Sequence, residues 1–150
     1  MIMDNLSVGI IGLGVGESHI AGYEKHQKCR VTKICDNNLE VLQEVNRRNY
    51  GKIPVTDPND IIFDSSIDIV SIATYDDCHK DQVIASLKNG KHVFVEKPIC
   101  LNNEELLSIV SVMRENPKLK VSSNLILRRC PRFIDLRKRI RSGELGQVFH

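Results

Sequence analysis

The fold class is indicated by the stretch LSVGIIGLGVG at residues 6–16. Leu6–Ile11 is short, apolar and rich in β-branched residues, which predicts a buried strand, and the glycines that follow at every second position predict a tight turn. We expect a helix over Glu17–His26. Such a turn before a helix N-terminus lets backbone N–H groups approach a pyrophosphate. The spacing GxGxG is one residue shorter than the usual GxGxxG, and a glycine turn without a ligand is the alternative.

Outward from this stretch, strand-like and helix-like segments alternate. We predict further strands at Arg30–Cys35, Ile67–Ala73, His92–Val95 and Lys120–Ser123. Helices are predicted over Leu39–Asn49 and in a short segment that starts after Asp57-Pro58 and includes Ile61 and Ile62. A third predicted helix contains Val83, Ile84 and Leu87 and ends at Gly90, and a fourth starts at a cap formed by Asn102 and Glu105. The last contains Phe133, Leu136 and Ile140 and ends at Gly143. This alternation predicts an α/β fold with a doubly wound, mostly parallel sheet of the Rossmann type. Leu145–His150 is typical of the start of another strand, so we expect the chain to be truncated there.

Asp36 ends the second predicted strand, 20 residues after Gly16. An acidic residue at this position accepts hydrogen bonds from the adenosine ribose of a dinucleotide and repels a 2′-phosphate. Asn37 and Asn38 are neutral and no Arg follows directly, so the sequence favours NAD over NADP. One alternative is a loop aspartate that caps the next helix. Another is an S-adenosylmethionine methyltransferase, although Ser7–Ile11 lacks the acidic residue that usually precedes the glycines of those enzymes.

The composition is typical of a globular protein, with one uneven feature. The net charge is +2, but residues 1–119 carry 13 basic and 17 acidic side chains, whereas residues 120–141 carry eight basic ones and a single acid, Asp135. We interpret this basic segment as a solvated or docking surface, with nucleic-acid or partner binding as the alternative. The five cysteines form no CxxC pair, residues 1–150 contain no membrane-length apolar run, and we expect no signal peptide. We therefore expect a cytoplasmic protein with reduced thiols that binds neither nucleic acid nor membrane.

Several ordered motifs resemble the Gfo/Idh/MocA oxidoreductases, the family of glucose–fructose oxidoreductase and inositol dehydrogenase. These motifs are the glycine turn with His19 behind it, Asp36, Ile69–Thr74 with His79 five residues on, and Gly90–Pro98 with the sequence GKHVFVEKP. Near the end, Ser142–Gly146 is similar to the family's crossing into its second domain.

The resemblance implies an NAD(P)-dependent dehydrogenase that transfers hydride between nicotinamide and a CH–OH group of a sugar, cyclitol or similar polyol. It implies that Lys97 is the catalytic-site lysine, because a nearby ammonium stabilises a developing alkoxide. Glu96 is then expected to orient the Lys97 loop and Pro98 to fix it through a cis bond, while His19 packs or caps. No metal site is expected. The residues expected at the cofactor are Gly12, Leu13, Gly14, Val15, Gly16, Asp36, Asn37, Ala73, Thr74, Tyr75, His79, Glu96 and Lys97.

Three features depart from the family pattern. The glycine turn is short, Thr74-Tyr75-Asp76 stands where relatives have Thr-Pro-Asn, and the family's catalytic histidine, substrate pocket and oligomer interface belong to a second domain. We therefore predict a dinucleotide-binding domain at residues 1–124 and a crossing helix with the start of a truncated C-terminal α/β domain at residues 125–150. We expect residues 1–150 to bind cofactor without turnover, and the parent protein to form a homo-oligomer. A non-catalytic dinucleotide-binding sensor or partner module is the alternative.

Overall fold

The centre of the molecule is a parallel sheet. A computed structural model describes residues 5–149 and contains six strands in the order β3-β2-β1-β4-β5-β6, with every neighbouring pair parallel. The strands are β1 (Leu6–Ile11), β2 (Cys29–Cys35), β3 (Ile53–Val55), β4 (Ile69–Ile72), β5 (His92–Val95) and β6 (Val121–Ser123). The predicted doubly wound α/β fold is therefore confirmed.

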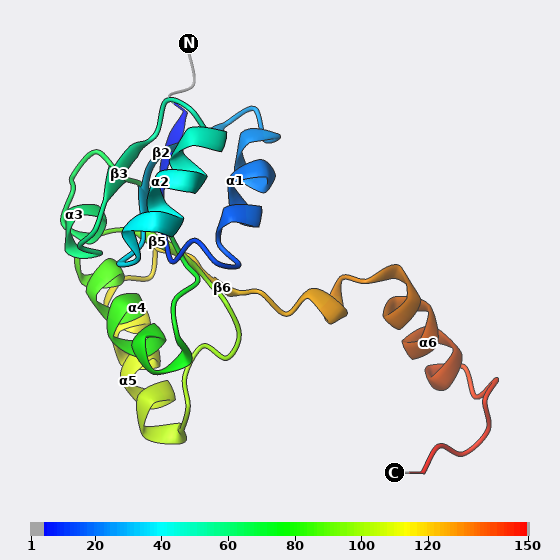
Figure 1. Cartoon of the computed structure of the whole chain (residues 1–150). Helices are drawn as coiled ribbons and strands as arrows, with labels where there is room; N and C mark the ends of the chain where they lie inside the picture. Colours follow the sequence, from blue (N-terminus) through cyan, green and yellow to red (C-terminus); the bar gives the residue numbers. More distant parts are fainter. Residues whose placement is uncertain (1–4, 150) are drawn as a thin grey trace.

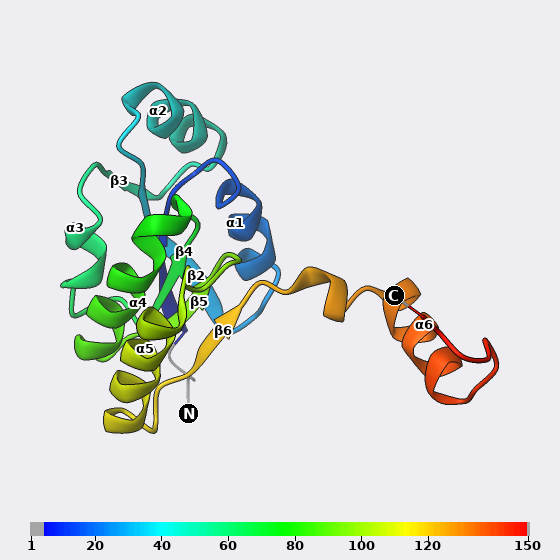
Figure 2. The same ribbon diagram turned by 90° about the horizontal axis from the view of Figure 1, so that it is seen from below.

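Helices cover both faces of this sheet. The covering helices are α1 (Glu17–Glu24), α2 (Leu39–Arg48), α3 (Asn59–Ile62), α4 (His79–Lys88) and α5 (Asn103–Glu115). The helix α6 (Pro131–Arg141) lies apart from the sheet, and η1 (Asp76–Cys78) and η2 (Ile126–Arg128) are single 3-10 turns. Figures 1 and 2 show α1 and α2 on one face and α3, α4 and α5 on the other. The chain changes faces when it leaves the edge strand β3 and returns to the centre as β4, beside β1.

The side chains of β1 alternate between two buried cores. Val8 and Ile10 belong to the core under α1 and α2, whereas Ile11 belongs to the core under α3, α4 and α5. Gly9 also lies on the α3 side, where an added Cβ would come 2.3 Å from Cγ2 of Ile61. The missing side chain therefore allows α3 to pack closely on the strand.

The helix ends follow their local sequence signals. Asn102 caps α5 by accepting a hydrogen bond from the Glu105 backbone N–H at 2.9 Å, and the Glu105 carboxylate accepts from the Leu101 N–H at 2.8 Å. Gly90 follows α4 with φ +76°, the left-handed conformation that ends helices at glycine.

Two elements differ from the sequence prediction. The strand β3 was not predicted, because it has three residues, an exposed edge position and a central Pro54 without an N–H group. The strand predicted at Leu145–His150 is wrong over residues 145–149, which form turns and irregular backbone, and His150 lies outside the described residues. A strand needs a partner to pair with, and no described strand lies beside this segment.

Residues from about 125 to 149 leave the sheet and extend away from it (Figures 1 and 2). No residue of α6 is buried, although the helix carries an apolar side formed by Phe133, Leu136 and Ile140. None of the helices within residues 5–149 combines the length and hydrophobicity that a membrane span requires.

Candidate functional site

One row of backbone hydrogen bonds aligns the carboxyl ends of the strands. In each bond, the residue that follows one strand donates its N–H to the last carbonyl of the neighbouring strand. The pairs are Asp36 to Val55, Gly12 to Cys35, Ala73 to Ile11, Glu96 to Ile72 and Asn124 to Val95, at N···O distances of 3.4, 2.8, 2.7, 2.8 and 2.8 Å. The predicted site residues that follow β1, β2, β4 and β5 therefore lie along one edge of the sheet. This is the edge where open α/β sheets bind ligands, at the point where the crossovers change direction.

The three glycines of the turn have different environments. An added Cβ on Gly12, whose φ is +85°, would come 2.4 Å from the Ala73 carbonyl oxygen, and one on Gly16 would come 2.0 Å from the Gly12 carbonyl oxygen. An added Cβ on Gly14 would have no heavy atom within 4 Å. Gly12 and Gly16 are thus required by packing inside the turn, whereas Gly14 borders open space that a ligand can approach. In the short GxGxG turn the first and third glycines are therefore packed against backbone, and the second is open to solvent.

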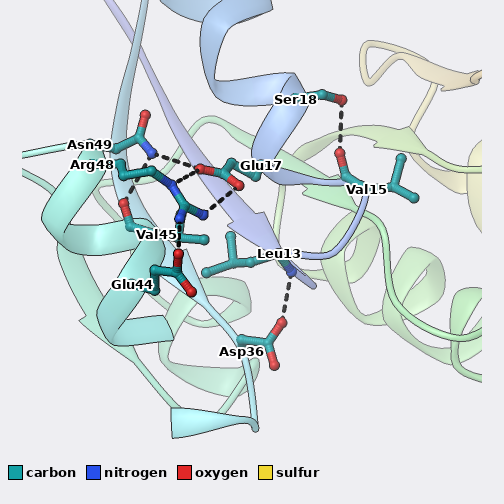
Figure 3. A network of polar contacts seen from close by, with 9 residues as sticks. All are labelled: Leu13, Val15, Glu17, Ser18, Asp36, Glu44, Val45, Arg48 and Asn49. Atoms are coloured by element: carbon teal, nitrogen blue, oxygen red, sulfur yellow. Dashed lines mark hydrogen bonds and ion pairs between the residues drawn. The ribbon is translucent and has the colours of Figure 1, made fainter. Parts of the chain in front are cut away.

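Asp36 is bound to the glycine turn. Its Oδ2 accepts a hydrogen bond from the Leu13 N–H at 2.8 Å (Figure 3), and its Oδ1 accepts from the Asn38 N–H at 2.8 Å. The side chain that caps α2 is Asn38, which accepts from the Glu40 and Val41 N–H groups, so the helix-cap alternative for Asp36 is wrong. An ionised carboxylate has about four acceptor positions, so Asp36 retains capacity for ribose hydroxyls.

An ion pair compensates an acidic charge at the start of α1. Glu17 directly follows Gly16, and Nε and Nη2 of Arg48 each lie 2.9 Å from one oxygen of its carboxylate (Figure 3). The hydrogen bond from Arg48 is the largest influence on Glu17 and lowers the pKa of its carboxyl. Arg48 also pairs with Glu44 on its own helix. An unpaired Glu17 carboxylate would repel an anion bound at the N-terminus of α1, and the positive charge of Arg48 reduces this repulsion.

His79 connects the loops that follow β4 and β5. Its ring is fully buried, with Nδ1 2.6 Å from the Pro98 carbonyl oxygen and Nε2 3.1 Å from the Thr74 carbonyl oxygen. The Thr74 hydroxyl donates to Oε1 of Gln82 at 2.8 Å. Tyr75, in contrast, is 82% exposed. The loop after β4 is therefore held at Thr74 and open to solvent from Tyr75.

Lys97 lies on an exposed loop whose base is held by Glu96. The predicted cis bond is present at Lys97-Pro98. Oε1 of Glu96 lies 3.1 Å from Nε2 of His19 and accepts from the Asn124 side-chain amide at 2.6 Å, while Oε2 accepts from the Lys97 N–H at 3.3 Å. Burial alone would raise the pKa of the Glu96 carboxyl, but the hydrogen bonds from Asn124 and His19 outweigh it and lower that pKa.

Two members of this network, His19 and Asn124, were not predicted from the sequence. His19 was expected only to pack or cap, and its place directly behind the glycine turn was the signal available for a larger role. Asn124 carried no signal, because nothing in its local sequence distinguishes it from an ordinary loop asparagine.

Comparison with known proteins identifies the family. The family model GFO_IDH_MocA, described as "Oxidoreductase family, NAD-binding Rossmann fold", matches residues 6–124. The chain belongs to this family. The family predicted from the motifs is therefore confirmed, and the chain is an NAD-binding Rossmann domain of an oxidoreductase.

Individual relatives of the Gfo/Idh/MocA family agree with this assignment. Inositol 2-dehydrogenase of Rhodococcus erythropolis is 30% identical over 145 residues, which cover 95% of this chain and 42% of that protein. Levoglucosan dehydrogenase of Pseudarthrobacter phenanthrenivorans is 31% identical over an alignment of 156 residues, which covers 97% of this chain and 40% of that protein. The crystal structure of the WlbA dehydrogenase of Bordetella pertussis, in complex with NADH and UDP-GlcNAcA, superposes with a TM-score of 0.84 at 25% identity, over 97% of this chain and 44% of that one. The chain thus spans less than half the length of these relatives.

Proposed function

We propose that this domain binds NAD in preference to NADP along the carboxyl edge of its sheet. The pyrophosphate lies at Gly14, Val15 and Gly16, against the N-terminus of α1, and the adenosine ribose lies at Asp36 and Asn37. The observation that carries this proposal is the hydrogen bond between the Leu13 N–H and Asp36, because it holds the acidic side chain directly beside the turn.

The residues present fit a dinucleotide at this edge. Gly14 has the open space that a pyrophosphate needs to approach the backbone. Asp36 also provides the basis for discrimination, because a 2′-phosphate about 4 Å away meets a repulsion of about 4 kcal/mol per unit charge pair at an effective dielectric of 20. Solvent screening reduces this figure at a half-exposed carboxylate, so we expect a preference for NADH of roughly tenfold.

The nicotinamide end is assigned to the loops after β4 and β5, at Ala73, Thr74, Tyr75, Glu96 and Lys97, with the buried ring of His79 behind these loops. When bound, NAD supplies the hydride acceptor for oxidation of an alcohol. Lys97 is the catalytic residue in this proposal, because its exposed ammonium stabilises a developing alkoxide. His79 holds the two loops together, and Glu96 holds the base of the Lys97 loop.

For the whole protein we propose a dehydrogenase of a sugar, cyclitol or similar polyol. The inositol and levoglucosan dehydrogenases among its relatives support this substrate class. The dinucleotide-binding domain comprises residues 1–124, and residues 125–150 lead toward a second α/β domain that supplies the substrate pocket and the contacts of a homo-oligomer. The five free cysteines support a reducing compartment such as the cytoplasm.

Calorimetric titration with NADH and NADPH tests the cofactor assignment. The wild-type chain is expected to bind NADH roughly tenfold more tightly than NADPH. The Asp36→Ser variant should narrow this gap, whereas Asn37→Ser, a neutral change at the neighbouring position, should preserve it. An unchanged ratio in Asp36→Ser would show that the ribose assignment is wrong.

A second candidate is a dinucleotide-binding module without catalysis, which the exposed Tyr75 and the acidic Asp76 favour. Both candidates predict that residues 1–150 bind NADH but reduce no NAD in the presence of inositols or sugars. Reduction of NAD by this chain alone would contradict the proposal that the substrate pocket lies elsewhere. If the whole protein reduces NAD and its Lys97→Ala variant does not, the dehydrogenase is favoured over the non-catalytic module.

A further inference from the structure

His19 lies between the cofactor turn and the Lys97 loop. Its backbone N–H donates to the Gly16 carbonyl oxygen at 3.0 Å, so the residue belongs to the first turn of α1. Its side chain is 7% exposed and points toward the sheet, where the ring contacts Phe94 edge-on at a centroid distance of 5.3 Å. Both ring nitrogens have polar partners, Oγ of Ser71 at 3.0 Å and Oε1 of Glu96 at 3.1 Å.

The chemistry of these partners assigns the protons. An ionised carboxylate only accepts hydrogen bonds, so the proton lies on Nε2, which donates to Glu96. In the neutral ring Nδ1 is then an acceptor, and the hydroxyl of Ser71 donates to it. His19 therefore holds Glu96 in a defined position, and Glu96 in turn accepts from the Lys97 N–H at 3.3 Å.

We propose that His19 is a positioning residue that acts through Glu96 to hold the Lys97 loop at a fixed place relative to the glycine turn. The importance of this position rests on the proposed function, in which Lys97 meets the substrate at the nicotinamide end. The hydrogen-bond chain runs from α1, which follows the pyrophosphate-binding turn, through His19 and Glu96 to the Lys97 backbone. Asn124 supports the same Glu96 oxygen from the end of β6.

A matched pair of variants separates this role from simple packing. In His19→Gln the side-chain amide nitrogen takes the place of Nε2 and keeps the bond to Glu96. In His19→Asn the amide nitrogen takes the place of Nδ1, which faces Ser71, and the bond to Glu96 is lost. A third variant, Ser71→Ala, removes the other partner and leaves the bond to Glu96 in place.

The measurement is hydrogen exchange of the Lys97 amide in the ligand-free chain, read by NMR, with the free energy of unfolding determined for each variant. We expect His19→Asn to accelerate exchange about tenfold, the factor for the loss of one hydrogen bond to a charged group. In His19→Gln and Ser71→Ala the exchange rate should stay within about twofold of the wild type, because both variants keep the hydrogen bond between residue 19 and Glu96. Equal rates in His19→Asn and His19→Gln would overturn the proposal, as would a tenfold acceleration in Ser71→Ala.

The same samples distinguish a failure of this proposal from a failure of the proposed function. NADH titration of the wild-type chain tests cofactor binding alone, whereas Lys97 amide exchange is measured without NADH. A wild type that binds no NADH contradicts the proposed function, and the exchange rates still decide the role of His19. If His19→Asn does not fold, the Lys97 amide exchange rates of Ser71→Ala and His19→Gln are still compared with the wild type. Faster exchange in either variant contradicts the proposed link from His19 through Glu96 to the Lys97 loop.

Discussion

Alanine at Gly16 and alanine at Gly14 are expected to have opposite effects on stability. A Cβ at Gly16 would lie 2.0 Å from the Gly12 carbonyl oxygen and 3.1 Å from both Cβ of Ala73 and Cγ2 of Ile10. Because the nearest of these atoms is backbone, the turn itself must move. We expect the free energy of unfolding to fall by about 3 kcal/mol, the upper part of the range for overpacked sites.

Gly14 provides the matched control. An added Cβ there meets no heavy atom within 4 Å, and φ of Gly14 lies outside the left-handed region. Alanine then mainly restricts the unfolded chain, so we expect a gain of about 0.4–1 kcal/mol in stability. The same methyl group occupies the space through which a pyrophosphate approaches the backbone, so NADH affinity should fall at least about tenfold.

Urea unfolding followed by circular dichroism gives the stabilities, and nicotinamide fluorescence gives the NADH dissociation constants. The dependence of stability on urea should be the same in all three proteins, so that the midpoints can be compared directly. A Gly16→Ala chain as stable as the wild type would refute the packing argument for the turn. A Gly14→Ala chain that binds NADH as tightly as the wild type would refute the pyrophosphate assignment.

Three further predictions concern charges and a thiol. The pKa of the Asp64 carboxyl is lowered from 3.8 to about 2, and the hydrogen bond from Lys33 is the largest cause. The ionised Asp64 carboxylate therefore stabilises the fold fully above about pH 4, and this stabilisation is lost as the pH falls toward 2. Urea midpoints should therefore fall less steeply on acidification in Asp64→Asn than in the wild type, and parallel profiles would contradict this. Arg48→Gln leaves the Glu17 charge uncompensated at the start of α1 and should weaken NADH binding about threefold. The double variant that also carries Glu17→Gln should regain the wild-type affinity for NADH. Additive losses of affinity in the double variant would exclude a coupling between Arg48 and Glu17. Burial raises the pKa of the Cys35 thiol to about 12, so alkylation followed by mass spectrometry should find it modified only after unfolding, and rapid modification of the folded chain would disprove its protection.

The sequence predicted those parts of the fold that depend on local patterns. The strand His92–Val95 was predicted with the bounds that the structure gives, because its apolar residues lie between clear turn signals at Gly90 and Lys97-Pro98. Asn102 and Gly90 were correctly expected to begin and end helices. In contrast, β3 has three residues around Pro54, too few for any periodicity, and it forms only because the edge of β2 is available for pairing.

The candidate site was predictable where a single residue type is required by chemistry. Gly12, Gly14, Gly16 and Asp36 were predicted for a dinucleotide site because such a site calls for these residue types after the first two strands. The structure brings them together at the carboxyl ends of β1 and β2. The support of the Lys97 loop could not, because it depends on contacts between residues far apart in the sequence. His19 and Glu96 are separated by 77 positions, and only the parallel order of the strands brings them within 3.1 Å.

Binding of NAD at the carboxyl edge of the sheet can be followed residue by residue in amide NMR spectra of the chain titrated with NADH. We expect saturable shifts of the amides that follow β1 and β2, above all Gly14, Val15 and Asp36. The amides of Asp68 and Lys91, at the amino ends of β4 and β5, should not shift. Shifts confined to the amino ends, or none at millimolar NADH, would contradict the claim.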